Sequence, residues 1–345
     1  MRAWSLLTLL MLAFGIFCFA GGFERPPMDV IQRGYRGLGM VQVVNPRRLE
    51  DKLAENKIPD PQPTVDPAGT PSSEAYENVK VLGDVDSAEF IRLMAAITDW
   101  VAPQQGCNYC HSEDGNFASD ALYTKVVARR MLQMVRNING NWQTHVNGTG
   151  VTCYTCHRGQ PVPANVWFHE PGRLRAAGLL GNNAGQNDPI RGPDNSSLPY
   201  DSFTPFLEQD NNIRVVATTA LPGTDHKSIK QTEWTYALMT HFSTSLGVNC
   251  TYCHNSRSFF AWDQSTPQRS TAWYGIRMVR DVNNDYLNSL HGVFPPYRLG
   301  VLGDVAKVNC NTCHQGAFKP LYGISMLKDY PELGAAKPAA SASAQ

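Results

Sequence analysis

The sequence contains few charged residues and no excess of either sign. Only 17 % of its 345 residues are Asp, Glu, Lys or Arg, and 30 basic residues balance 30 acidic ones. Nucleic-acid binding relies on a surplus of basic residues that neutralise phosphates. The composition therefore gives no reason to expect a nucleic-acid partner.

Long apolar runs are also scarce, and the one at the N-terminus stands out. Residues 4–23 read WSLLTLLMLAFGIFCFAGGF, and about 20 such residues can span a bilayer. The same residues fit a signal segment, with Arg2 as a short basic region and small residues at positions 20–22 for cleavage. We predict that residues 1–23 are a membrane anchor, with a cleaved signal segment as the alternative. Either one directs the rest of the chain across the membrane.

One cysteine, Cys18, lies inside this apolar run. A lipidated bacterial cysteine normally follows a small residue, whereas Phe17 precedes Cys18. We therefore expect Cys18 to be an inert apolar residue, with a lipid anchor at Cys18 as the weaker alternative.

The other eight of the nine cysteines form four copies of Cys-x-x-Cys-His. The cysteine pairs are Cys107 and Cys110, Cys153 and Cys156, Cys250 and Cys253, and Cys310 and Cys313, followed by His111, His157, His254 and His314. Each copy is typical of c-type haem attachment, in which two thiols form thioethers with the haem and the histidine binds the iron. A zinc ribbon or a thioredoxin-like redox pair does not need that histidine. We predict four covalently bound haem c groups.

Glycine and proline are frequent, at 28 and 23 residues, which indicates much irregular chain. We predict a mainly α fold with much irregular coil, in which porphyrins supply much of the apolar core. The expected organisation is a membrane anchor or signal segment at 1–23, an extended N-terminal arm at 24–85, a first di-haem half at 86–159, a connector at 160–228, a second di-haem half at 229–320 and a C-terminal segment with a disordered tail at 321–345.

An internal repeat underlies the two halves. Met94 precedes the first motif and Met239 precedes the third at nearly the same spacing, while Met134-Val-Arg-Asn and Met278-Val-Arg-Asp precede the second and fourth motifs. The order helix, haem, helix, haem is thus expected twice. We infer two di-haem halves related by a pseudo-two-fold axis.

Two helices are readable from apolar stripes and capping signals. One stripe is formed by Phe90, Leu93, Met94, Ile97 and Val101, and the other by Val127, Met131, Met134, Val135 and Ile138. Asp86 with Glu89, and Ser228 with Gln231, have the spacing of capping boxes.

The sixth iron ligands decide whether such a protein carries electrons or catalyses a reaction, because an open iron can bind substrate. Met94 and Met239 lie at matching places in the repeat and are candidates for the first and third haems. Met131 and Met134 are both candidates for the second. In the second half Gly275 aligns with Met131, so the fourth haem needs another donor. Spacing leaves His145 and His291 open for that role.

The matching stretches at residues 79–83, 126–132, 149–159, 265–269, 275–281 and 327–334 resemble the tetrahaem cytochrome c subunit of purple-bacterial photosynthetic reaction centres. The resemblance implies Met94, Met131 and Met239 as sixth ligands of the first three haems. It implies His145 for the fourth, which would then be a bis-His centre with His314.

The same resemblance implies partners and a place in the cell. The protein would cover the reaction-centre L and M subunits at the periplasmic face of the photosynthetic inner membrane, tethered by an N-terminal helix. Electrons would come from a soluble cytochrome c or high-potential iron–sulfur protein. They would reach the photo-oxidised bacteriochlorophyll special pair through haems ordered third, fourth, second and first with increasing distance from the pair. Arg269 would lie near the third haem and the special pair, or bind a haem propionate. Further candidates to bind propionates are Arg129, Arg130, Arg277 and Arg280.

We therefore predict an electron-transfer subunit and not an enzyme. The alternative is a membrane-anchored tetrahaem quinol dehydrogenase that feeds periplasmic reductases, since such proteins also carry an anchor and four motifs. A multihaem reductase would need an open iron, and every predicted haem here has a candidate sixth ligand.

Overall fold

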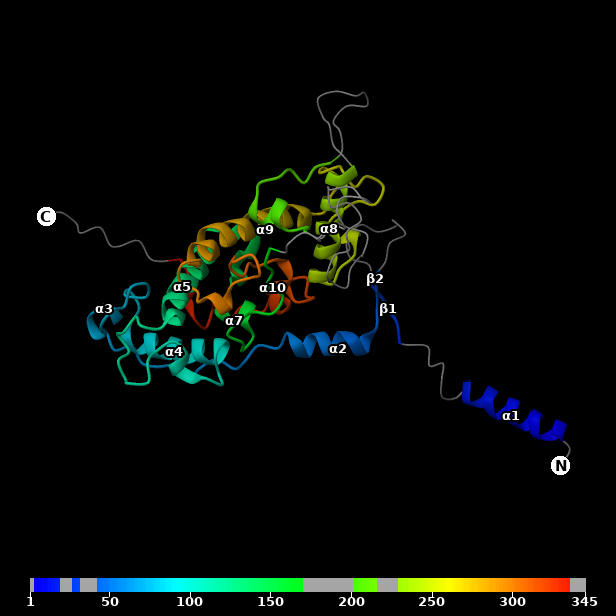
Figure 1. Ribbon diagram of the computed structural model, residues 1–345, viewed down its shortest axis with the longest axis horizontal. Coiled ribbons are helices and arrows are strands. Elements are labelled where there is room, and N and C mark those ends of the chain that lie inside the picture. The colour runs from blue at the N-terminus through cyan, green and yellow to red at the C-terminus, as the bar shows by residue number, and fades with distance from the viewer. Residues whose placement is uncertain (1–2, 19–26, 32–41, 170–200, 216–228, 336–345) are drawn as a thin grey trace, which may run out of the picture.

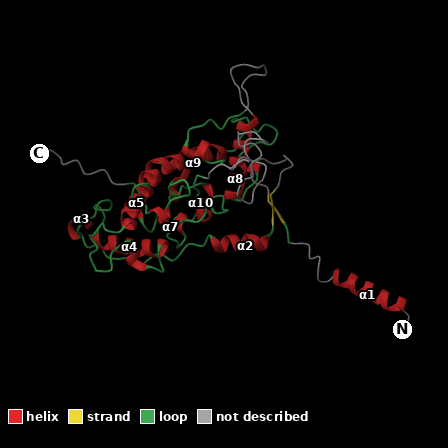
Figure 2. Cartoon of the chain, viewed as in Figure 1, coloured by secondary structure: helices red, strands yellow, loops and turns green. Residues whose placement is uncertain are grey.

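Helices joined by long irregular segments make up the chain (Figures 1 and 2). The computed structural model describes residues 3–18, 27–31, 42–169, 201–215 and 229–335. The predicted mainly α architecture with much coil is confirmed. Within the described ranges the strands are β1 (Asp29–Ile31) and β2 (Gln42–Val44), which pair antiparallel with Val30 opposite Val43.

The longer helices are α1 (Ala3–Phe17), α2 (Pro46–Glu55), α4 (Ser87–Val101), α5 (Tyr123–Asn141), α8 (Ile229–Leu246) and α9 (Pro267–Asp281). Short helical segments are α3 (Ser72–Ala75), η2 (Gly106–Tyr109), α6 (Gln143–Val146), η3 (Asn147–Thr149), α7 (Cys153–His157), η4 (Thr204–Glu208), η5 (Cys250–Tyr252), η6 (Val282–Leu287), η7 (Asn288–Leu290), η8 (Pro296–Arg298), α10 (Cys310–His314), η9 (Pro320–Gly323) and η10 (Pro331–Leu333). The order of long helix, 3₁₀ turn, long helix and five-residue helix occurs as α4, η2, α5, α7 and again as α8, η5, α9, α10.

The predicted start of α4 is confirmed in part. Asp86 is the N-cap residue, and its carboxylate accepts a hydrogen bond from the backbone amide of Ala88 at 2.9 Å. The side chain of Glu89 does not complete the box but pairs with Arg92 at 3.2 Å. Ser228, the predicted cap of α8, lies outside the described residues.

An extended segment between α2 and α3 lies across α4 and is fastened by the buried side chain of Arg92. Its guanidinium donates to the carbonyl of Pro63 at 3.0 Å and to that of Asp329 at 2.9 Å. The same group lies 4.5 Å above the ring of Tyr330. One charged side chain therefore joins the N-terminal arm, α4 and the C-terminal segment, and these hydrogen bonds compensate its burial.

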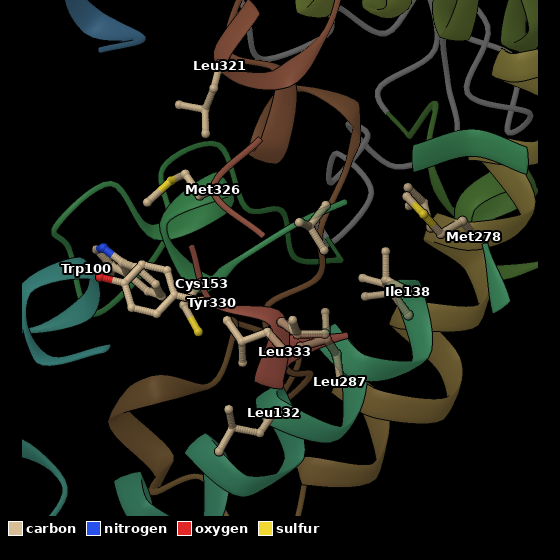
Figure 3. Close-up of a cluster of buried hydrophobic side chains, with 14 of the residues drawn as sticks. Trp100, Leu132, Ile138, Cys153, Met278, Leu287, Leu321, Met326, Tyr330 and Leu333 are labelled. Atoms are coloured by element: carbon tan, nitrogen blue, oxygen red, sulfur yellow. The ribbon is translucent and has the colours of Figure 1, made fainter. Parts of the chain in front are cut away.

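Buried side chains from distant parts of the chain form one cluster (Figure 3). Trp100 of α4 packs against Tyr330, with ring centroids 4.7 Å apart and planes at 83°. Ile138 of α5 and Leu287 of η6 belong to the same cluster, and α5 contacts η6. The C-terminal segment contributes Leu333, so it is part of the core.

The N-terminal helix α1 lies apart from the body (Figure 1). Its apolar side chains are exposed, with Trp4 at 84 % and Met11 at 69 %. Among the described residues, no helix has both the length and the apolar character that a membrane crossing requires.

Candidate functional site

A large cavity runs through the body of the protein. Its volume is about 1910 Å³, whereas a site for one small molecule usually measures roughly 300–1,000 Å³. All sixteen residues predicted to attach haem or bind iron line this cavity: Cys107, Cys110, His111, Cys153, Cys156, His157, Cys250, Cys253, His254, Cys310, Cys313, His314, Met94, Met131, Met239 and His145. The cavity is large enough for several cofactors, and the chain presents every predicted ligand to it.

The four motifs adopt two conformations that follow the repeat. The first and third lie in short 3₁₀ helices, η2 and η5. The second and fourth are five-residue α-helices closed by capping boxes, Thr152 with Thr155 and Asn309 with Thr312. Both of these helices end in a left-handed residue followed by a glycine of positive φ. The alternation of the two conformations agrees with the pairing of motifs inferred from the sequence.

Each motif histidine is oriented by a backbone carbonyl. The Nδ1 atoms of His111, His157, His254 and His314 lie 3.2, 2.8, 2.9 and 2.9 Å from the carbonyl oxygens of Phe117, Gln160, Phe259 and Ala317. A carbonyl can only accept, so Nδ1 carries the proton and Nε2 has its lone pair free. Metal-binding histidines are generally held by such a bond from the other ring nitrogen.

Burial keeps these side chains uncharged. It lowers the pKa of all four motif histidines, that of His314 to about 4. Burial also raises the pKa of the Cys153 and Cys310 thiols to about 12. Neutral imidazole is the form that binds iron. Across the described ranges, no group of three or more His, Cys, Asp or Glu side chains is arranged to hold a metal ion.

The second and fourth motifs meet directly. A disulfide joins Cys156 to Cys313, with Cα atoms 4.5 Å apart. Haem attachment uses the same two sulfur atoms for thioethers, so this disulfide and the two thioethers are alternative states of the pair. The disulfide requires that α7 and α10 be neighbours, and the two helices are in contact.

Contacts between helices place the four motifs in a spatial order. The helix α4 contacts η2 of the first motif and α7 of the second. The helix α7 contacts α10 of the fourth motif, and α10 contacts α8, which leads into the third motif at η5. The order in space is therefore first, second, fourth, third, which differs from the order along the chain.

His145 of α6, which precedes the second motif in the chain, faces the fourth motif. Its Nδ1 donates to the carbonyl of Thr271 on α9 at 2.9 Å, and its ring centre lies 6.2 Å from that of His314. Two metal–nitrogen bonds of about 2.0 Å, plus the distance from each bonding nitrogen to its ring centre, span about 6 Å. The separation thus fits one metal ion between the two imidazoles.

The other described histidines outside the motifs do not line the cavity. The Nε2 atom of His291 lies 2.9 Å from the carbonyl of Gly303, and the residue is exposed. His169 pairs with Glu208 at 2.6 Å, and His241 contacts Phe203. His226 lies outside the described residues. Spacing left both His145 and His291 open as the sixth ligand of the fourth haem, and the geometry favours His145.

The five arginines predicted to bind haem propionates differ in whether they line the cavity. Arg129, Arg269, Arg277 and Arg280 line the cavity, whereas Arg130 does not. Arg269 lies 4.3 Å above the ring of Trp262 and donates to the carbonyl of Ala261 at 2.9 Å. Arg130 instead lies over Tyr286.

Sequence reasoning missed the five backbone carbonyls that hold the histidines, and it also missed Lys125, which lines the cavity and is 8 % exposed. A carbonyl belongs to every residue and carries no sequence signal. The burial of Lys125 also has no sequence signal, because it depends on how the loop before α5 folds back over the side chain.

Comparisons with known proteins agree with this geometry. The family model described as photosynthetic reaction centre cytochrome C subunit matches residues 24–334. The chain belongs to this family. The photosynthetic reaction center cytochrome c subunit of Rubrivivax gelatinosus is 54 % identical over 98 % of this chain and 92 % of its own length.

Two further relatives carry the same name. The protein of Thermochromatium tepidum is 50 % identical over 90 % of this chain and 76 % of its own length. The protein of Roseobacter denitrificans is 41 % identical over 88 % of this chain and 85 % of its own length. Membership of this family confirms the predicted electron-transfer role in the photosynthetic reaction centre, and with it covalently bound haem c and association with the membrane-bound complex.

Proposed function

We propose that this reaction-centre cytochrome holds four haem c groups in its large cavity and relays electrons from a soluble periplasmic donor to the photo-oxidised bacteriochlorophyll pair. The observation that carries this proposal is that all four Cys-x-x-Cys-His motifs and all four candidate sixth ligands line that cavity. When bound, each haem supplies one-electron chemistry at its iron. The chain attaches, orients and shields these groups.

The sixth ligands in this proposal are Met94, Met131 and Met239 for the first three haems and His145 for the fourth. In support, Met94 and Met131 lie on helix faces that also line the cavity with Phe90 and Val127. Methionine raises the potential of a haem relative to a second histidine, so the fourth haem should have a lower potential than the others. Two halves related by a pseudo-two-fold axis are part of the same proposal.

The electron path in this proposal follows the spatial order of the motifs. The contacts from η2 through α4, α7, α10 and α8 to η5 support the order first, second, fourth, third. The third haem would lie nearest the bacteriochlorophyll pair, against the L and M subunits. The first would lie farthest away and accept electrons from a soluble cytochrome c or a high-potential iron–sulfur protein.

The protein in this proposal does not catalyse a reaction of its own. The support is that each predicted iron has a candidate sixth ligand at the cavity wall, which leaves substrate no coordination position. Absence of carbon monoxide binding to the reduced protein is the expected result.

In this proposal the N-terminal segment attaches the protein to the periplasmic side of the membrane. The exposed apolar side chains of α1, among them Leu7 at 63 % and Phe14 at 67 %, suit an acyl environment. Mass spectrometry of the mature subunit would distinguish retention of residues 1–23 from their cleavage and from lipidation of Cys18.

Flash spectroscopy of membranes tests the proposed function. A single flash should oxidise the bacteriochlorophyll pair and then a c-type haem of this subunit, and a soluble donor should re-reduce it. Reduction of the haems by quinol with no light-induced haem oxidation would instead favour the quinol dehydrogenase. A count of haems per chain, from the absorbance of denatured protein, tests the number four.

A further inference from the structure

Lys125 is a buried cation beside the first motif. Its side chain is 10 % exposed, and its ammonium donates to the carbonyls of Phe117 at 2.6 Å and Ser119 at 2.8 Å. Lysine is rarely buried unless its charge is compensated. Here two carbonyls and the carboxylate of Asp120, at 3.4 Å, provide that compensation.

The carbonyl of Phe117 is also the acceptor for His111. It therefore receives two donors, Lys125 Nζ at 2.6 Å and His111 Nδ1 at 3.2 Å. The histidine bond is the longest of the four motif histidine bonds, the others being 2.8 to 2.9 Å. A carbonyl already bound to an ammonium is a poorer acceptor, so the proton on Nδ1 is held less strongly by it.

Two effects of this arrangement act on the iron in the same direction. A weaker bond from Nδ1 makes the imidazole a weaker electron donor to iron, since outer partners raise ligand basicity. A positive charge in a poorly solvated place also favours the reduced, less positive haem. Both effects raise the reduction potential.

We propose that Lys125 is a positioning residue that raises the potential of the first haem by sharing the Phe117 carbonyl with His111. The inference rests on the proposed haem at the first motif. Lys125 acts through the carbonyl and its own charge, and it does not bind iron.

The sharing of one carbonyl by a motif histidine and a buried cation is particular to the first half of the repeat. The alignment of Met131 with Gly275 and of Met134 with Met278 places Lys125 opposite Arg269. Arg269 donates to the carbonyls of Ala261 at 2.9 Å and Phe260 at 3.5 Å, whereas His254 Nδ1 bonds the carbonyl of Phe259. The cation of the third motif therefore does not share the carbonyl that holds the histidine.

Redox titration of Lys125→Met tests the proposal. The equilibrium constant for reducing the first haem should fall at least tenfold, which for one electron is a midpoint about 59 mV lower. The first-haem component is assigned with Met94→His, which exchanges its proposed sixth ligand. The EPR g values of that ferric haem should also change, because they respond to the donor strength of the axial imidazole.

Lys80→Met is the matched control. Lys80 pairs with the same carboxylate, Asp120, at 3.1 Å, but its side chain is 60 % exposed and solvent screens its charge. Lys125→Arg should retain the potential. A first-haem midpoint in Lys125→Met equal to that in Lys80→Met would overturn the proposal.

A second variant tests the proposal if Lys125→Met does not fold. Asp120→Asn removes the carboxylate that pairs with Arg129 at 2.7 Å and with Lys125 at 3.4 Å, so the charges of both cations are less compensated and the first-haem midpoint should rise. An unchanged midpoint would again overturn the proposal. If no component responds to Met94→His, or fewer than four haems are found, the proposed haem set is wrong, which is a separate result.

Discussion

The ring of His145 fills the space that a side chain at Gly275 would need. A Cβ atom at Gly275 would lie 2.5 Å from Cε1 and 2.8 Å from Nδ1 of His145. Real Cβ atoms do not approach other atoms so closely, and the ring is held in place by its bond to Thr271. The absence of a side chain on α9 is therefore what lets a histidine from the first half reach the fourth motif.

Gly275→Ala should displace the His145 ring and remove the proposed sixth ligand of the fourth haem. One haem in four should become high-spin and bind carbon monoxide, as read from absorbance spectra of the reduced protein. Gly148→Ala is the control, because a Cβ atom there meets nothing within 4 Å. A fully low-spin spectrum for Gly275→Ala would remove His145 from the ligand set.

Met131 and Met134 should differ sharply when replaced by alanine. Met134 aligns with Met278, which is 8 % exposed and packs in the core. Met131 aligns with Gly275, the place where His145 supplies a donor. Met131→Ala should therefore make the second haem high-spin, whereas Met134→Ala, at a partly buried position, should destabilise the fold by about 0.5–3 kcal/mol without changing the spin state. The opposite pattern would reassign the ligand to Met134.

The Cys156–Cys313 disulfide should form only in molecules that carry no haem at the second and fourth motifs. Peptide mass spectrometry of haem-free chain made under oxidising conditions should find the two cysteines cross-linked. Subunit purified from membranes should instead give both motif peptides with haem attached. Cross-linked peptide in protein with four haems would mean that the second and fourth haems are each held by one thioether.

Asp86 should make a pH-dependent contribution to stability. Hydrogen bonds from the amides of Ala68, Ala88 and Gly69 lower the pKa of its carboxyl below 3.8. The carboxylate therefore stabilises the fold above pH 3.8, and that stabilisation is lost as the pH falls through the lower folded-state pKa.

Asp86→Asn keeps a hydrogen-bond acceptor but removes the charge. Urea unfolding followed by circular dichroism should show this variant less stable than the parent at neutral pH, and the difference should shrink as the pH falls below 3.8. A stability difference that stays constant over this range would show that the charge of Asp86 is irrelevant.

Local sequence signals predicted the parts of the site that depend on neighbours in the chain. The motifs, the stripes on α4 and α5 and the cap at Asp86 are of this kind. The contact of α7 with α10 and the meeting of His145 with Gly275 depend on packing between segments far apart in sequence. Periodicity carries no information about such pairings, and the alignment of Gly275 with Met131 showed only that a donor had to come from elsewhere.

The lining of one cavity by all four motifs has an electrostatic consequence. If no layer of protein separates neighbouring haems, the charge gained when one is reduced acts on the next across a short, poorly screened distance. The four midpoints would then not be four independent constants. Reducing one haem would lower the apparent potential of its neighbour, so each step of a titration would depend on how many electrons the subunit already holds.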